Sequence, residues 1–196
     1  MRTKVRPGLL ALAVGVCVGC GTASAPLSSN PSPASGIPTS LRGYHMTSLE
    51  PIAERDGGGQ LYRFNDRSAA WVTVFVYPIP EDVKQTGDSA EWVVVEGEKF
   101  ARVLPVLVQR GQYQAYEMAF ADPEPVVAGS DTIPGFAAAA VTRSGGDVSV
   151  QLEYIYLVRG RFVKVRATLP ENGWQQAPVP LFARDLVQAM HSHDSR

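Results

Sequence analysis

VSVQLEYIYLVRGRFVKVRATL, residues 148–169, is the stretch that decides the fold. Two runs rich in β-branched and aromatic residues flank Arg159-Gly160, which is the pattern of two strands joined by a tight turn. Strands of a hairpin pair residue by residue outward from the turn, so Tyr154 faces Val165. The apolar side chains of both strands then lie on one face. The stretch therefore predicts a β-hairpin, and the apolar area that it can bury places this hairpin in the middle of a sheet.

The charged residues of the hairpin support one register. With Arg159-Gly160 as the turn, Glu153 falls opposite Arg166, which makes an opposite-charge cross-strand pair. Pairing shifted by one residue would set Tyr154 against Lys164 and split the apolar side chains between two faces. The aligned register is therefore favoured. A type I′ turn needs a positive φ at Arg159, which disfavours arginine, so a slightly longer loop is the alternative.

The first twenty residues have the pattern of a targeting segment. Basic residues at positions 2, 4 and 6 precede an apolar stretch, residues 9–18, that is too short to span a bilayer as a stable helix. The tetrad CVGC, residues 17–20, resembles the bacterial lipoprotein signal, with Cys17 where that family usually carries leucine. The resemblance implies that Cys20 is lipidated and becomes the mature N-terminus. The alternative is cleavage after Ala23, which would leave a soluble periplasmic protein.

The lipoprotein resemblance also implies a location. Gly21 follows Cys20, in place of the aspartate associated with inner-membrane retention. The expected location is therefore the cell envelope, at the outer membrane rather than the inner, with a palmitate-type anchor and the domain in the periplasm. The tetrad also matches a Cys-x-x-Cys redox or metal pattern, but it lies at the end of an apolar signal. The chain has 2 cysteines, both in this tetrad, so the mature fold has neither a disulfide nor a thiol nucleophile.

Composition and charge bound the remaining possibilities. The chain has 196 residues, of which 45% are hydrophobic and 19% charged, enough for one domain and a tail. Its formal net charge is −1, and removal of the three cations Arg2, Lys4 and Arg6 with the signal leaves −4. A domain with this charge is a poor match for a nucleic-acid surface. We therefore expect no nucleic-acid partner.

The chain is predicted to have four segments. They are a signal peptide (1–19), a lipidated N-terminus with a flexible tether (20–41), a single α/β domain (42–192) and a C-terminal tail (193–196). The tether is rich in serine, proline, alanine and glycine and has almost no charge, so it cannot bury enough apolar surface to become ordered. An arm that lies along the domain is the alternative.

Seven strands are expected in the domain. They span residues 42–50, 61–64, 71–77, 113–120 and 136–143 and the two arms of the central hairpin. Strand 71–77 is apolar on both faces, which predicts that both faces are covered. Strand 136–143 pairs with the hairpin so that Val141 faces Val150. Residues 121–135 contain three prolines and are expected to form a long loop.

Two helices are expected, each with an apolar stripe. The first begins at Asp88, which fits a capping box with Glu91. Pro105 predicts a kink or a break in this helix, and Arg110-Gly111 predicts its end. Its stripe consists of residues at helical spacing: Val93, Gly97, Phe100, Leu104 and Leu107. The last helix begins near Pro180 and directs Phe182, Leu186 and Ala189 inward.

The order of elements, β-β-β-α-β-β-β-β-α, predicts an α+β fold, a mainly antiparallel sheet of about six to seven strands with helices packed on it. With the late strand FVKVRAT, residues 162–168, before a terminal helix, this order resembles the PsbP-like α/β/α sandwich group over about residues 42–192. The resemblance implies an accessory or binding role in the assembly of membrane complexes, mostly without catalysis.

The histidines and acidic residues offer two groups of potential metal ligands. His191 and His193 offer two ligands but lie near the chain terminus without an evident third. Asp122, Glu124 and Asp131 lie in the proline-rich stretch, and their spacing fits no calcium loop. The sequence also lacks the nucleophile elbow, zinc helix, dinucleotide turn and phosphate loop of common enzyme families. We therefore predict no catalytic residue, metal or cofactor.

Three groups of side chains bear on partner binding. One is a group of basic residues near the hairpin. They form a basic edge that binds anionic headgroups or an acidic partner, or they are simply solvated strand ends. The group consists of Arg143, Arg159, Arg161, Lys164 and Arg166. Another is apolar and lies either beneath a helix or in an exposed patch for a partner: Ile155, Leu157 and Phe162. The third is predicted to form a solvated helix face that includes an i,i+4 ion pair of Glu98 with Arg102: Glu96, Glu98, Lys99 and Arg102.

These observations favour a lipid-anchored, non-enzymatic envelope protein whose domain binds another protein. The second hypothesis is a periplasmic carrier of a small apolar ligand held between sheet and helix. Gly97 and the alanine-rich strand argue against a carrier, because close approach of helix and sheet leaves little cavity. An enzyme is the least supported hypothesis, because no activated nucleophile or acid–base constellation is evident.

Overall fold

A computed structural model of the chain describes residues 36–66 and 70–193. The predicted signal peptide and the lipid attachment site at Cys20 lie outside the described residues. Among the helices of the described part, none is both long enough and apolar enough to cross a membrane.

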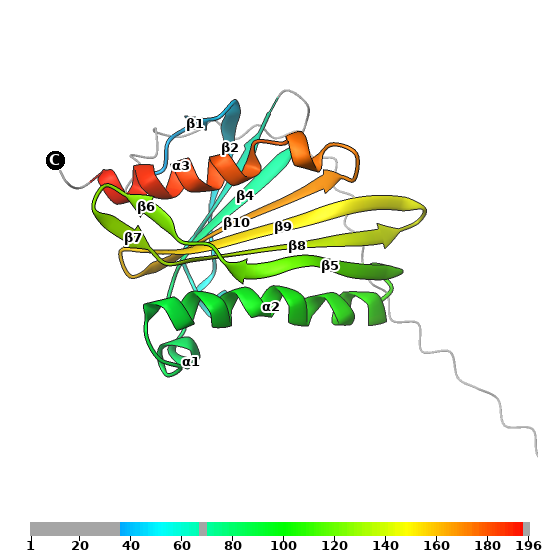
Figure 1. The fold of residues 1–196 in the computed structure, drawn as a ribbon, viewed down its shortest axis with the longest axis horizontal. Coiled ribbons are helices and arrows are strands. Elements are labelled where there is room, and N and C mark those ends of the chain that lie inside the picture. The colour runs from blue at the N-terminus through cyan, green and yellow to red at the C-terminus, as the bar shows by residue number, and fades with distance from the viewer. Residues whose placement is uncertain (1–35, 67–69, 194–196) are drawn as a thin grey trace, which may run out of the picture. The chain divides into compact units, whose positions relative to one another are not determined.

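The described chain is built on an eight-stranded antiparallel sheet with the strand order β1-β2-β3-β4-β10-β9-β8-β5 (Figure 1). Its strands are β1 (Ser40–Leu41), β2 (Tyr44–Pro51), β3 (Gln60–Asn65), β4 (Trp71–Pro78), β5 (Ala115–Pro123), β8 (Gly135–Ser144), β9 (Asp147–Val158) and β10 (Arg161–Pro170). A separate two-stranded sheet consists of β6 (Val126–Ala128) and β7 (Asp131–Ile133). The predicted α+β class with a mainly antiparallel sheet is confirmed.

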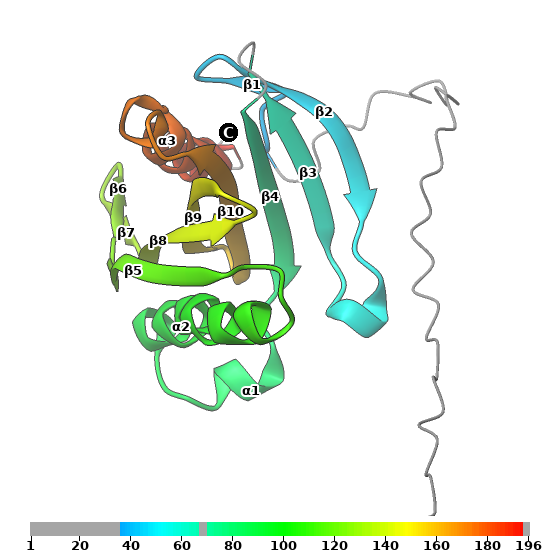
Figure 2. The ribbon, with the colours of Figure 1, turned by 90° about the vertical axis from the view of Figure 1, so that its right-hand side faces the viewer.

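Helices cover both faces of the sheet (Figure 2). Helix α2 (Ser89–Gln109) packs on β5, β8 and β9, and the short helix α1 (Glu81–Lys84) lies beside it. Helix α3 (Val179–Ser192) and the β6–β7 pair lie on the opposite face. Each face has its own apolar core. Phe182 of α3 contacts the rings of Tyr44 and Phe64 on one side, and Phe100 of α2 packs with Phe162 on the other.

The central hairpin has the predicted register and position. Strands β9 and β10 pair so that Tyr154 faces Val165 and Glu153 faces Arg166, and the two strands lie in the middle of the sheet order. Arg159 and Gly160 have φ values of 52° and 70°, so the turn contains two residues with left-handed conformations. The alternative of a longer loop is therefore wrong. The guanidinium of Arg159 donates to the carbonyl oxygen of His191, a contact that compensates the unfavourable backbone conformation.

The other strand pairings also follow the alternation of apolar residues. Val141 of β8 faces Val150 of β9, as predicted. Strands β3 and β4 form the second hairpin. Val72, Val74 and Val76 of β4 are buried on the α3 side, whereas Trp71 on the other face is 52% exposed. The prediction that both faces of this strand are covered is therefore wrong for its Trp71 end, because α2 covers Tyr77 but does not extend over the whole width of the sheet.

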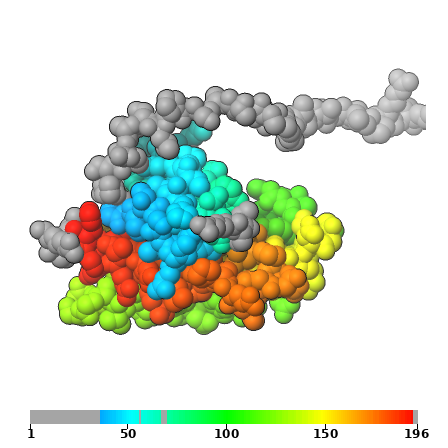
Figure 3. Space-filling view, turned by 90° about the horizontal axis from the view of Figure 1, so that it is seen from above, coloured from blue at the N-terminus to red at the C-terminus, as the bar shows by residue number. Residues whose placement is uncertain are grey.

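The N-terminal boundary of the domain lies earlier than position 42. Ile37 is 1% exposed and belongs to the core on the α3 side, and Ser40–Leu41 pair with β2. Arg42 binds Asp185 of α3 with its Nε at 2.5 Å from the carboxylate. Figure 3 shows this first part of the described chain against α3. Residues 36–41, assigned to the tether by composition, are therefore part of the domain, because burial of Ile37 and the pairing of β1 with β2 hold them there.

Helix α2 begins and ends as predicted but is not broken. Asp88 accepts hydrogen bonds from the backbone of Ala90 and Glu91, and the Glu91 side chain completes the capping box. Gly111 follows the helix with φ +71°. The helix runs through Pro105, since proline removes one backbone hydrogen bond while the packing on the sheet holds both halves. The break predicted at this proline is therefore wrong.

One further prediction is corrected at the edge of the sheet, and the predicted inward face of α3 is confirmed for two of its three residues. Residues 121–135 are not a long loop, because β5 continues to Pro123 and the β6–β7 hairpin follows. In α3, Phe182 and Leu186 are buried as predicted, together with Val187 and Met190. Ala189 is half-buried.

Candidate binding groove

An apolar groove of about 290 Å³ lies beside the C-terminal half of α2, where the helix leaves residues 71–75 of β4 and 166–168 of β10 uncovered. Its walls are aromatic and aliphatic: Trp71, Phe75, Phe100, Val103, Leu107 and Tyr113. Thr73, Gln151, Arg166 and Thr168 add polar groups. The groove exists because side chains of β4 alternate between two faces, and on the face opposite the valines α2 covers Tyr77 but not Trp71.

Two side chains of this groove expose unusually large apolar areas. Trp71 at the start of β4 is 52% exposed, and Val103 of α2 is 37% exposed. Val106 of α2 and Tyr116 of β5 are 37% and 38% exposed but do not line the groove. Apolar side chains that are scattered singly on a surface need no explanation, whereas a group at a groove is typical of a binding site.

Arg166 is held at the groove by two contacts. Its Nε donates to Oε2 of Glu153, its cross-strand partner, whose side chain is 1% exposed. The guanidinium carbon lies 6.0 Å from the centre of the Phe75 ring. Half of the Arg166 side chain nevertheless remains exposed, at 46%. The terminal amino groups of the guanidinium make no hydrogen bond or ion pair with another described residue, so they can receive a carboxylate.

A buried cluster of charges lies between α2 and the sheet. Glu96 of α2, 4% exposed, receives a hydrogen bond of 2.9 Å from the hydroxyl group of Tyr77 and one of 3.1 Å from Nζ of Lys164. Nζ of Lys99 lies 2.8 Å from the other oxygen of Glu96. Lys164 also lies 3.7 Å from Glu153, which connects this cluster with Arg166.

The electrostatics of this cluster keep Glu96 ionised. Burial by itself would raise the pKa of Glu96, but the nearby charge of Lys164 and the hydrogen bonds from Lys99, Lys164 and Tyr77 outweigh it and lower the pKa. Burial, followed by the charge of Glu96, raises the pKa of the Tyr77 hydroxyl well above its usual value. The cluster therefore acts as a set of ion pairs between helix and sheet.

The prediction that the charged residues of α2 form one solvated face is only half right. Glu98 and Arg102 form the expected i,i+4 ion pair at 2.6 Å on the exposed side. Glu96 was assigned to the same face and is buried instead. The signal was present in the spacing, because Glu96 lies three residues after Val93 and four before Phe100, both in the apolar stripe. Glu96 was predicted to be exposed because glutamate is charged, although its spacing places it in the apolar stripe.

The five basic residues near the hairpin do not form one basic edge. Lys164 and Arg166 bind the buried carboxylates, and Arg159 binds the end of α3. Arg143 and Arg161 are exposed but lie at opposite ends of β9, opposite Val148 and Val158. Arg143 and Arg161 are therefore far apart along the strand, although both were grouped with the hairpin by sequence.

The apolar group near the hairpin turn is covered. Ile155 and Phe162 are fully buried beneath α2, and Leu157 packs against the same core. Gly97 of α2 makes this contact close, since a Cβ on this glycine would lie 2.1 Å from Cδ1 of Phe136. An exposed patch at Ile155, Leu157 and Phe162 is therefore excluded, and the exposed apolar surface lies at the groove instead.

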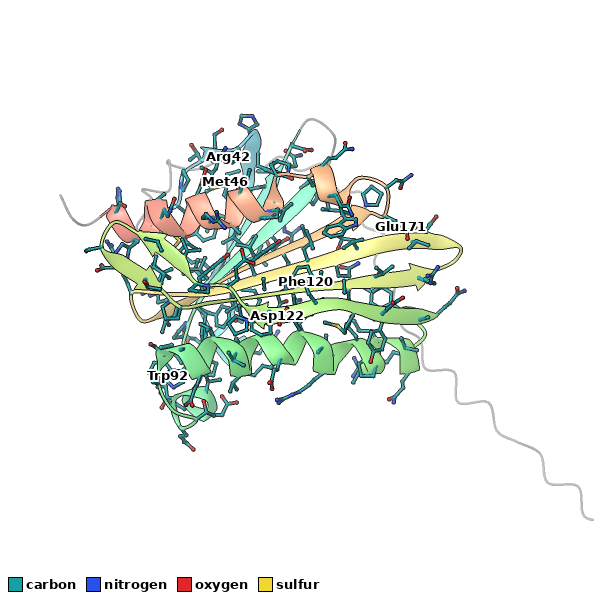
Figure 4. The ribbon with its side chains drawn as sticks, in the orientation of Figure 1. Arg42, Met46, Trp92, Phe120, Asp122 and Glu171 are labelled. Carbon is teal, nitrogen blue, oxygen red and sulfur yellow. The ribbon has the colours of Figure 1, made fainter. Side chains whose placement is uncertain are left out.

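The residues considered as metal ligands are distributed over separate contacts. Asp122 is exposed on β5 (Figure 4), Glu124 lies 3.9 Å from Arg184, and Asp131 lies 3.0 Å from Nε2 of His191. The His193 side chain packs against Gly36. Within residues 36–66 and 70–193, no three histidine, cysteine or acidic side chains are placed to hold a metal ion.

Comparisons with known proteins bear on the fold only. No protein-family model and no curated protein sequence matches the chain. The solution structure of cyanobacterial PsbP (CyanoP) from Synechocystis sp. PCC 6803 is similar with a TM-score of 0.47 and 16% sequence identity. The similar region covers 84% of this chain and 97% of that chain.

Proposed function

We propose that this chain is a non-catalytic, lipid-anchored protein of the bacterial cell envelope whose domain binds another protein through the groove beside α2. The observation that carries the binding role is Trp71, a tryptophan that is 52% exposed on a strand in the interior of the sheet. A strand holds the backbone of Trp71 in place before a partner binds, so only its side chain has to be ordered, which favours binding.

The residue types of the groove support a protein partner. Tryptophan, tyrosine and arginine are enriched among the residues that contribute most to protein–protein affinity. The groove combines Trp71, Tyr113 and Arg166 with aliphatic walls from α2.

The buried charge cluster supports a non-catalytic role. Glu96 and Lys164 are the groups at which acid–base chemistry would be sought, but their side chains are only 5% and 13% exposed. Because each charge is compensated by the other, the pair connects α2 with the sheet rather than facing a substrate.

The anchor and its location rest on the sequence. The tetrad ending in Cys20 supports lipid attachment there, and Gly21 supports the outer membrane, with the domain in the periplasm. The segment between Cys20 and residue 36 then connects the domain to the membrane. A groove on the domain is thereby offered to envelope proteins within reach of the anchor.

A photo-crosslinking experiment in intact envelopes tests the binding role. A photoreactive amino acid in place of Val103 reports on the groove, and the same amino acid in place of Leu181, which is 45% exposed on α3, is the matched control. We expect a discrete crosslinked protein from position 103 that disappears with Trp71→Ala. Equal products from both positions, or none from position 103, would contradict the proposal.

A carrier of a small apolar ligand is the second candidate, because the groove lies between helix and sheet. Its volume of about 290 Å³ is just below the range of roughly 300–1,000 Å³ usual for small-molecule sites. Native mass spectrometry of the purified protein separates the candidates. A reproducible ligand mass that is lost with Trp71→Ala would favour the carrier.

A further inference from the structure

Within the described part of the chain, the groove beside α2 presents a positive charge and no negative charge. Arg166 is the one charged residue among its described lining residues, and no carboxylate lines it. We infer, on the basis of the proposed protein-binding function, that the partner segment carries an acidic side chain next to an aromatic or large aliphatic side chain.

The geometry of Arg166 suits a carboxylate. Glu153 takes the Nε hydrogen and Phe75 supports the guanidinium plane, so the side chain is oriented before a partner arrives. The terminal amino groups remain and can donate two parallel hydrogen bonds to one carboxylate. The hydrogen bond between Arg166 and Glu153 uses only Nε of the guanidinium and Oε2 of the carboxylate, and the other Glu153 oxygen is buried 3.7 Å from Nζ of Lys164.

The apolar walls next to Arg166 favour an aromatic or large aliphatic side chain beside the acidic one in the partner. Phe75 lies under the guanidinium, and Trp71 and Leu107 continue the apolar surface of the same groove. A carboxylate at Arg166 therefore places the neighbouring side chain of an extended segment over aromatic and aliphatic groups. Burial of that side chain supplies affinity, and the carboxylate supplies orientation.

A random peptide library displayed on phage, selected against the full-length protein, tests this inference. We expect the enriched peptides to share an aspartate or glutamate beside an aromatic or large aliphatic residue. Replacing this acid by its amide should weaken binding about tenfold, the loss expected when a charged hydrogen bond is removed. Trp71→Ala should weaken the same peptides, and Leu181→Ala should not.

The variant Arg166→Lys separates the effect of the bidentate guanidinium geometry from the effect of the positive charge. Lysine retains a cation beside Glu153 but cannot form the bidentate contact, so the acidic peptides should lose affinity and the amide peptides should not. If this variant does not fold, the acid and amide peptides on the unaltered protein still test whether a carboxylate is required. Enriched peptides without an acidic residue, or with basic residues, would overturn the inference but not the protein-binding role.

Failure to enrich any peptide that depends on Trp71 would also overturn the inference. The protein-binding role itself is judged separately, by the crosslink from position 103. A crosslinked partner without acidic-peptide binding would show that the groove is used by a different chemistry.

Discussion

Gly97 shows how one residue sets the distance between a helix and a sheet. Alanine is the better helix former by roughly 1 kcal/mol, so a solvent-facing Gly→Ala change would stabilise α2. At position 97 the new Cβ would lie 2.1 Å from the ring of Phe136, which is 4% exposed and cannot move freely. The steric conflict outweighs the propensity. We predict that Gly97→Ala lowers the free energy of unfolding by about 1–3 kcal/mol in urea denaturation.

A double variant distinguishes this conflict from a general effect on the helix. Phe136→Leu shortens the ring that meets position 97, so Gly97→Ala combined with Phe136→Leu should lose less than the sum of the two single losses. Additive losses would show that Phe136 is not the cause.

Glu96 contributes stability that depends on pH. Its pKa is below the reference value of 4.5 in the folded protein, so its contribution is fully present above about pH 4.5 and is lost as the pH falls through the folded value. At pH 7 we predict that Glu96→Gln lowers the free energy of unfolding by about 3 kcal/mol, because Lys164 and Lys99 lose their buried partner. Urea denaturation at a series of pH values should show this difference shrinking below pH 4.5.

Glu98→Gln is the matched control for that measurement. Glu98 is half exposed and pairs with Arg102 on the solvent side of the same helix. Its removal should cost no more than about 0.5 kcal/mol. A loss at position 98 as large as that at position 96 would mean that burial is not what distinguishes the two glutamates.

At the scale of elements, the β9–β10 turn depends on backbone conformation. Gly160 has φ +70° and no neighbouring atom within 4 Å of a Cβ added to it, so the cost of a side chain is conformational and not steric. We predict that Gly160→Ala lowers the free energy of unfolding by about 1–2 kcal/mol.

Gly173→Ala is the appropriate comparison for the turn. Gly173 has φ −123°, and its nearest atom to an added Cβ is Cγ of Pro170 at 3.7 Å, an ordinary contact. Alanine should therefore be neutral or slightly stabilising there. Equal losses at both glycines in thermal or chemical unfolding would refute a role for the left-handed conformation.

The strands also show how far local patterns can be carried. The alternation along residues 148–169 predicted both the pairing of β9 with β10 and the pairing of β8 with β9, because side-chain direction has a period of two residues. The same reasoning erred for β4. Its two faces are both apolar, but Trp71, Thr73 and Phe75 on one of them are not covered by α2 and form a wall of the groove.

At the scale of the whole molecule, the proposed membrane attachment depends on one residue, Cys20. We predict that Cys20→Ser abolishes acylation and moves the protein from the membrane fraction to the soluble periplasm or to an unprocessed form. Metabolic labelling with a fatty acid, followed by fractionation, provides the measurement. Lipid label that persists in the Cys20→Ser protein would place the attachment elsewhere.

The sequence by itself determined the class of fold, the register of the central strands, the capped start of α2 and the apolar face of α3. These features depend on periodicity and on residues close in the chain, and each is supported by several side chains at once. A single contrary residue, such as Arg159 with its positive φ, did not change the result.

Only the tertiary structure decided where the candidate site lies. Trp71, Val103 and Arg166 belong to three different elements, and their neighbourhood depends on how far α2 extends across the sheet. Burial of Glu96 depends likewise on Lys164, which is 68 residues away along the chain. Exposure and charge pairing result from contacts between distant segments, and no local period in the sequence records them.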